Sequence, residues 1–147
     1  MDEGGGIIGA EMQIQLSNNL NELAVVMAAL EDFCDGAGVD MGTAQAAELA
    51  LDEFLSNIIS YSYLDSEEHT ITVDLAVVER ALQIKISDNG MPFNPFEQAE
   101  PELESSIEER EIGGLGIHLV RNIMDEYSYA RLDECNVVTL SKRLNEG

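Results

Sequence analysis

The stretch Leu51-Asp-Glu-Phe-Leu-Ser-Asn57 lies within a predicted helix that runs from about Thr43 to Tyr61. Apolar residues three and four apart mark the buried side of this helix: Leu51, Phe54, Leu55, Ile58 and Ile59. At about 100° per residue, Glu53 and Asn57 lie one turn apart on another side, where their polar heads can meet. Such a pair can position a water or hydroxyl and ligate a hard cation, although an ordinary solvated helical face carries the same residue types.

Shorter periodic segments flank this helix. On its N-terminal side, alternation over residues 12–16 predicts a strand, and helical spacing from Leu20 to Leu30 predicts a first helix that Ser17 or Asn18 caps and Gly36 ends. On its C-terminal side come a predicted hairpin, a third helix and two closing strands. These lie at residues 71–77 and 82–86, joined at Glu79-Arg80, then at about 115–126, 128–132 and 136–142.

This order of elements predicts an α/β fold of the α+β two-layer sandwich type, with helices on one face of a mixed, mostly antiparallel sheet. A length of 147 residues suits one domain. We expect a flexible tail at residues 1–10 and a single domain at residues 11–147. Residues 91–112 lose periodicity and hold all three prolines, so we expect an irregular lid there.

The composition narrows the classes of function. Seven Lys and Arg against 29 Asp and Glu leave a formal charge of −22, which disfavours nucleic acid and anionic membranes and favours basic protein partners. The apolar stretches fall short of the ~20 residues of a membrane span, and the acidic N-terminus does not resemble a secretory signal, so we expect a cytoplasmic protein. The isolated cysteines and histidines, Cys34, Cys135, His69 and His118, predict neither a disulfide framework nor a zinc site.

A second polar motif, Asp88-Asn-Gly-Met-Pro-Phe-Asn-Pro95, follows a predicted strand. Gly90 can adopt backbone angles closed to other residues and allow a ligand to approach closely. The carboxylate of Asp88 can accept a hydrogen bond from an exocyclic amine. An ordinary Asp-Asn-Gly turn would explain the same residues without a ligand.

A glycine-rich run, Gly113-Gly114-Leu115-Gly116, directly precedes the third predicted helix. Its backbone amides and the positive end of the helix dipole can face phosphate oxygens, and Arg110 is close enough in sequence to add a charged contact. No Lys-Ser/Thr pair follows the glycines, so the run is not a Walker P-loop. A flexible hinge is the alternative explanation for such a cluster.

In this order, the helix with Glu53 and Asn57, the strand ending in Asp88 and the glycine-rich helix start resemble the GHKL-type ATPase family, whose ATP-binding domain is the Bergerat fold. Within that family, the motifs at residues 51–57, 88–95 and 113–120 look like those of the bacterial anti-sigma factor serine/threonine kinases. The ending Asn136-Val-Val-Thr-Leu-Ser-Lys-Arg143 also resembles theirs. The resemblance spans about residues 12–143.

The resemblance implies roles around two cofactors, ATP and Mg²⁺. Glu53 would orient or deprotonate the attacking hydroxyl, Asn57 would ligate Mg²⁺, and Asp88 would accept a hydrogen bond from the adenine amine. Thr139, on the last strand, would support adenine recognition near Asp88. The residues that would contact the nucleotide or its metal are Asn57, Asp88, Gly90, Arg110, Gly113, Gly114, Leu115, Gly116 and Thr139.

The function that the resemblance implies is an ATP-binding regulatory serine/threonine kinase. It would phosphorylate a STAS-domain antagonist, sequester a sigma factor and bind no nucleic acid or membrane, and homodimers are common among such relatives. An ATP-binding partner switch without kinase activity is the alternative. The catalytic half of a histidine kinase would need a phospho-acceptor helix, and gyrase-type ATPases need a further transducer domain for which this chain has no room.

Overall fold

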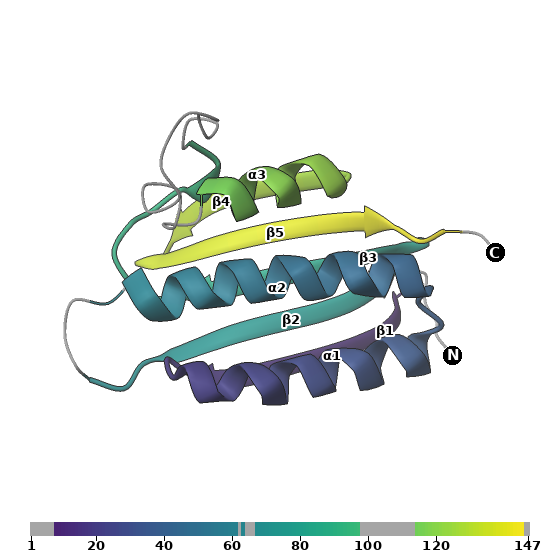
Figure 1. The fold of residues 1–147 in the computed structure, drawn as a ribbon, viewed down its shortest axis with the longest axis horizontal. Helices are drawn as coiled ribbons and strands as arrows, with labels where there is room; N and C mark the ends of the chain where they lie inside the picture. The colour runs from purple at the N-terminus through teal and green to yellow at the C-terminus, as the bar shows by residue number, and fades with distance from the viewer. Residues whose placement is uncertain (1–7, 62, 64–66, 98–113, 146–147) are drawn as a thin grey trace.

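A five-stranded sheet with a layer of helices forms the described part of the molecule (Figure 1). The computed structural model describes residues 8–61, 63, 67–97 and 114–145. The strands are β1 (Ile8–Ser17), β2 (Thr70–Val78), β3 (Ala81–Asp88), β4 (Glu126–Leu132) and β5 (Cys135–Arg143). The helices are α1 (Leu23–Ala37), α2 (Met41–Tyr61) and α3 (Gly114–Ile123), with short 3-10 segments η1 (Leu20–Glu22) and η2 (Pro95–Glu97).

The strands lie in the order β1-β2-β3-β5-β4, and each neighbouring pair is antiparallel. The prediction of a mixed sheet was therefore too broad for the described residues. The β2–β3 hairpin turns at Glu79 and Arg80, as predicted, with φ values of 52° and 67°. A two-residue turn with positive φ at both positions matches the right-handed twist of the strands it joins.

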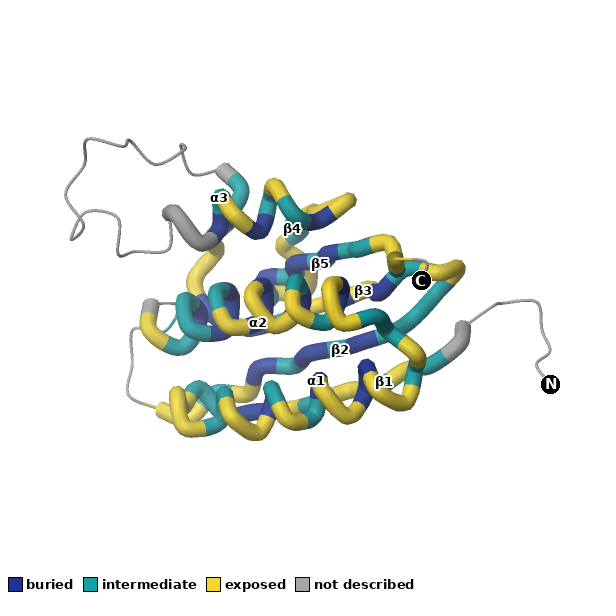
Figure 2. Tube along the Cα trace, turned by 45° about the vertical axis from the view of Figure 1, so that its right-hand side comes forward, coloured by how far each residue is buried: buried dark blue, intermediate teal, exposed yellow. Residues whose placement is uncertain are grey.

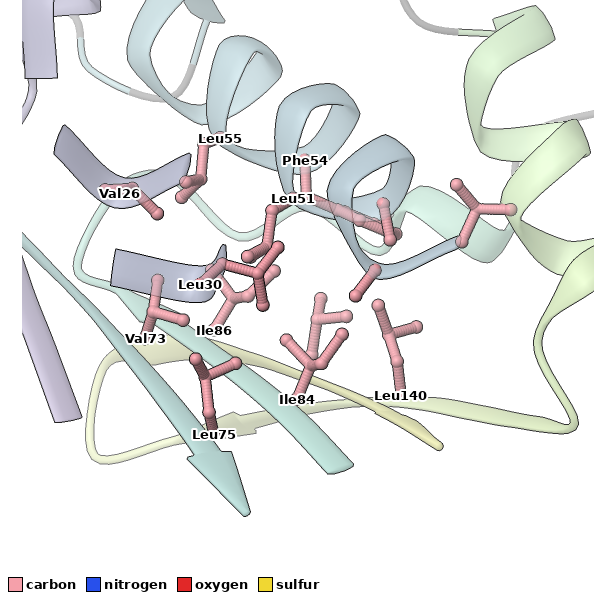
Figure 3. Close-up of a cluster of buried hydrophobic side chains, with 14 of the residues drawn as sticks. Val26, Leu30, Leu51, Phe54, Leu55, Val73, Leu75, Ile84, Ile86 and Leu140 are labelled. Carbon is pink, nitrogen blue, oxygen red and sulfur yellow. The ribbon is translucent and has the colours of Figure 1, made fainter. Parts of the chain in front are cut away.

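The helices pack over one face of the sheet, which confirms the predicted two-layer architecture. Figure 1 shows α1 and α2 side by side in front of the sheet, with α3 next to α2 over the β4–β5 side. Buried residues lie between the two layers, and exposed residues follow the outer sides of the helices (Figure 2). Figure 3 shows Val26, Leu30, Leu51, Phe54 and Leu55 from the helices meeting Val73, Leu75, Ile84, Ile86 and Leu140 from the sheet.

The ends of α1 differ from the prediction. Asn19, not Ser17 or Asn18, caps the 3-10 segment η1 that leads into α1: its side-chain oxygen accepts a hydrogen bond of 2.8 Å from the amide of Asn21. Glu22, at the N-cap position of α1 itself, makes no side-chain cap hydrogen bond. The helix passes through Gly36 and ends at Ala37, where Gly38 caps it with a left-handed φ of 74°. The amide of Gly38 closes the helix on the carbonyl of Cys34. A glycine was correctly predicted to end this helix, but the glycine that does so is Gly38 and not Gly36.

Two other predicted boundaries were wrong. β1 begins at Ile8, so residues 8–10 extend the edge strand and do not belong to the expected tail. The third helix ends at Ile123, and β4 begins at Glu126, inside the range expected to be helical. Tyr127, which continues the apolar spacing of the helix in the sequence, lies on β4 and packs on Phe96 with ring centroids 4.7 Å apart.

The expected lid is described only at its start. Residues 95–97 form η2, where Phe96 packs edge-on against Phe54 of α2 with ring centroids 5.8 Å apart. Residues 98–112 of the expected lid lie outside the described residues. Within the described residues, no helix is long and apolar enough to cross a membrane.

Candidate functional site

The three motifs predicted to form a site come together at one end of the sheet. Figure 1 shows the C-terminal half of α2, the end of β3, the start of β5 and the first turn of α3 at the same end. α2 also packs directly against α3. Glu53 and Asn57 come from α2, Asp88 and Gly90 follow β3, and Gly114 begins α3.

Glu53 and Asn57 meet as the helical spacing predicts. The side-chain amide of Asn57 donates a hydrogen bond of 3.2 Å to Oε2 of Glu53, and both residues are half-buried. Burial raises the pKa of the Glu53 carboxyl above its ordinary value; the hydrogen bond from Asn57 opposes the rise, and the charge of Asp52 adds to it. A half-buried carboxylate with a raised pKa and a fixed orientation is suited to accept a proton.

Asp88 is a buried carboxyl at the very end of β3, with only 4% of its surface exposed. Its Oδ2 accepts a hydrogen bond of 2.8 Å from the amide of Gly90 and one of 3.3 Å from Nδ2 of Asn136. Burial raises the pKa of the Asp88 carboxyl, and the contacts with Gly90, Asn136 and Arg131 counteract this rise. The hydrogen bonds therefore hold Asp88 in one orientation against the cost of burying it.

Asn136, which the sequence analysis did not select, organises this end of the sheet. It lies opposite Asp88 in the β3–β5 ladder and is likewise 4% exposed. Its Nδ2 also donates to the carbonyl of Met91 at 2.8 Å, while its Oδ1 accepts from the amide of Phe93 at 3.1 Å and from the hydroxyl of Tyr129. One side chain thus fixes Asp88 and the loop that follows it.

Arg131 adds a second support to that loop. Its Nη1 donates a hydrogen bond of 2.8 Å to the carbonyl of Gly90. Asn136 and Arg131 together hold the backbone on both sides of Met91. The Asp-Asn-Gly turn is therefore held by two side chains of the β4–β5 hairpin, which a simple connection between elements would not need.

The glycine-rich run is described only in part. Gly114, Leu115 and Gly116 form the first turn of α3, so the helix begins one residue earlier than predicted. The first amides of a helix have no partner within it and can bind an anion there. Arg110 and Gly113, the other residues expected at the phosphates, lie outside the described residues.

Thr139 is not brought near Asp88. It pairs with Lys85, three positions along β5 from Asn136, the residue that pairs with Asp88. Side chains alternate between the two faces of a strand, and buried Val138 and Leu140 mark the face under the helices. Thr139 instead lines a hollow on the other face of the sheet with Gln83, Ser128 and Ser141.

Two oxygen atoms of the site fit the ligands that the motifs imply. Within the described residues, Oδ1 of Asp88 and Oδ1 of Asn57 accept no hydrogen bond, whereas the other polar atom of each side chain is paired. The Asp88 oxygen is an acceptor for an amine, and the Asn57 amide oxygen is a ligand type that Mg²⁺ prefers. The residues present therefore fit a nucleotide with its magnesium ion.

One sheet covered by helices, with Glu53 and Asn57 on α2 and Asp88 at the end of β3, is the arrangement that the motifs predicted for an ATP-binding domain. A family model described as a histidine kinase-like ATPase domain matches residues 16–142, and the chain belongs to this family. This membership implies ATP binding, and it confirms the GHKL-type resemblance inferred from the motifs.

The similar proteins include regulatory kinases. The serine/threonine-protein kinase BtrW of Bordetella bronchiseptica is 33% identical over 93 residues, which cover 63% of this chain and 66% of BtrW. The serine-protein kinase RsbW of Listeria innocua is 26% identical over 145 residues, which cover 92% of this chain and 88% of RsbW. The anti-sigma F factor of Clostridium perfringens is 26% identical over 97 residues, which cover 65% of this chain and 69% of that factor.

A solved structure shares the fold. The structure of the RsbU and RsbW domains of a Mycobacterium tuberculosis protein matches with a TM-score of 0.68 and 18% identity. The match covers 94% of this chain but only 33% of that longer chain. This match shows the fold alone, whereas the named relatives bear out the expected class, the protein kinases related to anti-sigma factors.

Proposed function

We propose that this protein is an ATP-dependent serine/threonine kinase of the partner-switching type. The observation that carries the proposal is the Glu53–Asn57 pair, joined at 3.2 Å on α2 at the end of the sheet where Asp88 lies. It would phosphorylate a STAS-domain antagonist and bind a sigma factor, in keeping with relatives named serine-protein kinase and anti-sigma F factor.

Glu53 is the proposed catalytic base. The hydroxyl oxygen of the substrate Ser or Thr attacks the γ-phosphorus, the bond from that phosphorus to the β–γ bridging oxygen breaks, and ADP leaves. The hydroxyl proton passes to the Glu53 carboxylate. Burial and the hydrogen bond from Asn57 keep that carboxylate in a fixed position, and positioning supplies most of the catalysis in phosphoryl transfer.

The other site residues would bind ATP. Asp88 Oδ1 would accept a hydrogen bond from the adenine amine, while the small Gly90 lets the base approach. The amides of Gly114, Leu115 and Gly116 at the start of α3 would face the phosphates. Arg110 and Gly113 stay in this role on the sequence alone, and Thr139 drops out because it lies away from Asp88.

Asn57 Oδ1 would hold Mg²⁺ together with phosphate oxygens of the nucleotide. A bound magnesium ion would neutralise charge that develops on those oxygens during transfer. This local device matters here because the chain carries a formal charge of −22, which repels an anionic nucleotide. The same charge favours basic surfaces on the protein partners. As a separate point, we expect a homodimer, because homodimers are common among the proteins that the motifs resemble.

Phosphate transfer to a partner tests this function. The purified chain is incubated with γ-labelled ATP, Mg²⁺ and the STAS-domain protein encoded near it. We expect labelled STAS protein with the wild type, and a loss of label of at least about a hundredfold with Glu53→Gln. The matched control is Glu48→Gln, because Glu48 is an exposed glutamate on the same helix.

The same assay separates the kinase from the alternative. A wild type that binds Mg²⁺-ATP but transfers no label would favour an ATP-gated partner switch without kinase activity. Equal labelling by wild type and Glu53→Gln would contradict the role of Glu53. Asn57→Ala tests the proposed magnesium site. Because this variant lacks the Oδ1 ligand, its binding of ATP should depend less on Mg²⁺.

A further inference from the structure

Tyr63 carries a buried polar group that the proposed mechanism does not use. It follows α2, and its ring packs against the hydrophobic core. Its hydroxyl oxygen is buried and has no hydrogen-bond partner, the one side-chain atom in the described residues for which this holds. Leaving such a group unpaired costs about 1–3 kcal/mol, so its presence calls for an explanation.

The ring of Tyr63 is fixed at the end of the sheet where Asp88 lies. It stacks on His69 with ring centroids 4.1 Å apart and an angle of 8° between the planes. His69 directly precedes β2, and Thr72 of β2 pairs with Ser87 of β3. Continuing that antiparallel register by one pair places Ile71 beside Asp88, so His69 and the ring stacked on it lie at the Asp88 end.

The electrostatics agree with this placement. Burial raises the pKa of the Tyr63 hydroxyl well above its usual range, and the charges of Asp88 and Cys135 add to the rise. The charge of Asp88 thus acts on Tyr63, although the two side chains share no hydrogen bond. The Tyr63 hydroxyl and Oδ1 of Asp88, neither of which has a hydrogen-bond partner, thus belong to the same end of the sheet.

We propose that the Tyr63 hydroxyl is a second recognition group for the nucleobase, donating a hydrogen bond to the ring nitrogen next to the amine that Asp88 accepts, directly or through one water. Adenine presents an amine donor beside a ring-nitrogen acceptor, which matches the Asp88 and Tyr63 pair. Guanine presents a carbonyl beside an N–H donor. The carbonyl opposes the Asp88 carboxylate, whereas a tyrosine hydroxyl can also accept from an N–H, so Asp88 is the group that excludes guanine. The inference rests on the proposed nucleotide site and makes Tyr63 a residue that recognises the ring nitrogen of the base.

The test removes one partner at a time. Wild type and Tyr63→Phe are titrated with ATP, with its 1-deaza analogue, which keeps the amine but lacks the ring-nitrogen acceptor, and with GTP. We expect the wild type to bind the 1-deaza analogue about 3- to 10-fold more weakly than ATP. Tyr63→Phe should bind ATP more weakly by a similar factor and should no longer distinguish ATP from the 1-deaza analogue. Its preference for ATP over GTP should remain, because the Asp88 carboxylate still opposes the guanine carbonyl.

A purely structural role predicts a different pattern. Tyr127→Phe is the matched control, because the Tyr127 hydroxyl contacts Arg121 on the surface, and this variant should keep the wild-type discrimination. Without nucleotide, Tyr63→Phe should melt at or slightly above the wild-type temperature, since it removes an unpaired buried hydroxyl. A lower melting temperature with equal loss of affinity for ATP and its analogue would overturn the inference, as would unchanged discrimination. A wild type that binds no ATP would instead overturn the proposed function.

Discussion

Asn136 lies directly opposite Asp88 across β3 and β5, and its Nδ2 donates to the Asp88 carboxylate at 3.3 Å. The same side-chain amide forms hydrogen bonds with the carbonyl of Met91 and the amide of Phe93. Asn136 therefore contributes both to the stability of the fold and to the proposed adenine site at Asp88. Its effect on binding is indirect, because it orients the carboxylate and the loop that would receive the base.

Asn136→Ala should therefore lose both stability and nucleotide affinity. The substitution removes one of the two hydrogen bonds to the buried Asp88 carboxylate and takes the Asn136 partner from the part-buried Met91 carbonyl and Phe93 amide. Losing a partner of a buried polar group costs about 1–3 kcal/mol, and we expect the free energy of unfolding to fall by about that amount. Urea unfolding measures the stability, and ATP titration under conditions where the variant is folded measures the affinity. Asn122→Ala, an exposed asparagine that bonds His118, should change neither.

The pH dependence of phosphotransfer should report Glu53. A base must be ionised, and burial first, then the charge of Asp52, raises the pKa of Glu53 above its ordinary 4.5, against the opposing bond from Asn57. The rate should therefore rise with pH through a pKa higher than that of an ordinary glutamate. Asp52→Asn removes a nearby negative charge and should shift this limb of the pH–rate profile to lower pH. A limb that does not move in Asp52→Asn would argue that another group controls the rate.

The helix and hairpin predictions succeeded because their signals are local. Apolar spacing over 43–61 and alternation on both sides of Glu79-Arg80 specify α2 and the β2–β3 hairpin without knowledge of the rest of the chain. Glu53 and Asn57 met for the same reason, since one helical turn separates them. The predicted end of α3 was wrong because the apolar spacing of the helix continues by chance onto the inward face of β4.

The site residues that could not be predicted from the sequence depend on the register of the strands. Asn136 reaches Asp88 only because β5 pairs with β3 in one register, and no local pattern reveals that pairing. A shift along β5 by an odd number of residues moves a side chain to the opposite face, which is why Thr139 lies away from the base site. Tyr63 was missed because an unpaired hydroxyl can be recognised only once its surroundings are known.

The two glycines near the end of α1 should respond to alanine in opposite directions. Gly36 lies inside the helix with open space around it, so Gly36→Ala should stabilise the protein by about 0.5 kcal/mol through helix propensity. Gly38 has a left-handed φ of 74°, which costs a residue with a side chain about 1 kcal/mol, so Gly38→Ala should destabilise it. Thermal melting of both variants measures this, and the same sign of change for both would contradict the observed cap.

Asp40 joins the start of α2 to the end of the chain, and its contribution to stability should depend on pH. Its carboxylate accepts hydrogen bonds from the amide and hydroxyl of Thr43 at 2.9 and 2.7 Å, and from the amide and side chain of Asn145, both at 2.9 Å. Desolvation acts to raise the pKa of Asp40, but these four bonds outweigh it and hold the pKa well below the ordinary 3.8. The native state thus favours the ionised form.

Asp40→Ala should lower the free energy of unfolding at pH 7 by about 1–2 kcal/mol, as for the loss of a helix cap. Because the native pKa is depressed, the stabilisation is complete above pH about 5 and is lost progressively as the pH falls through the ordinary pKa of 3.8 towards the native one. The difference in unfolding free energy between wild type and Asp40→Ala should therefore shrink between pH 5 and pH 2, as measured by urea titrations at each pH. Asp32→Ala, an exposed aspartate on α1, should show a small difference at every pH. A gap between wild type and Asp40→Ala that stays constant down to pH 2 would show that Asp40 does not act through its charge.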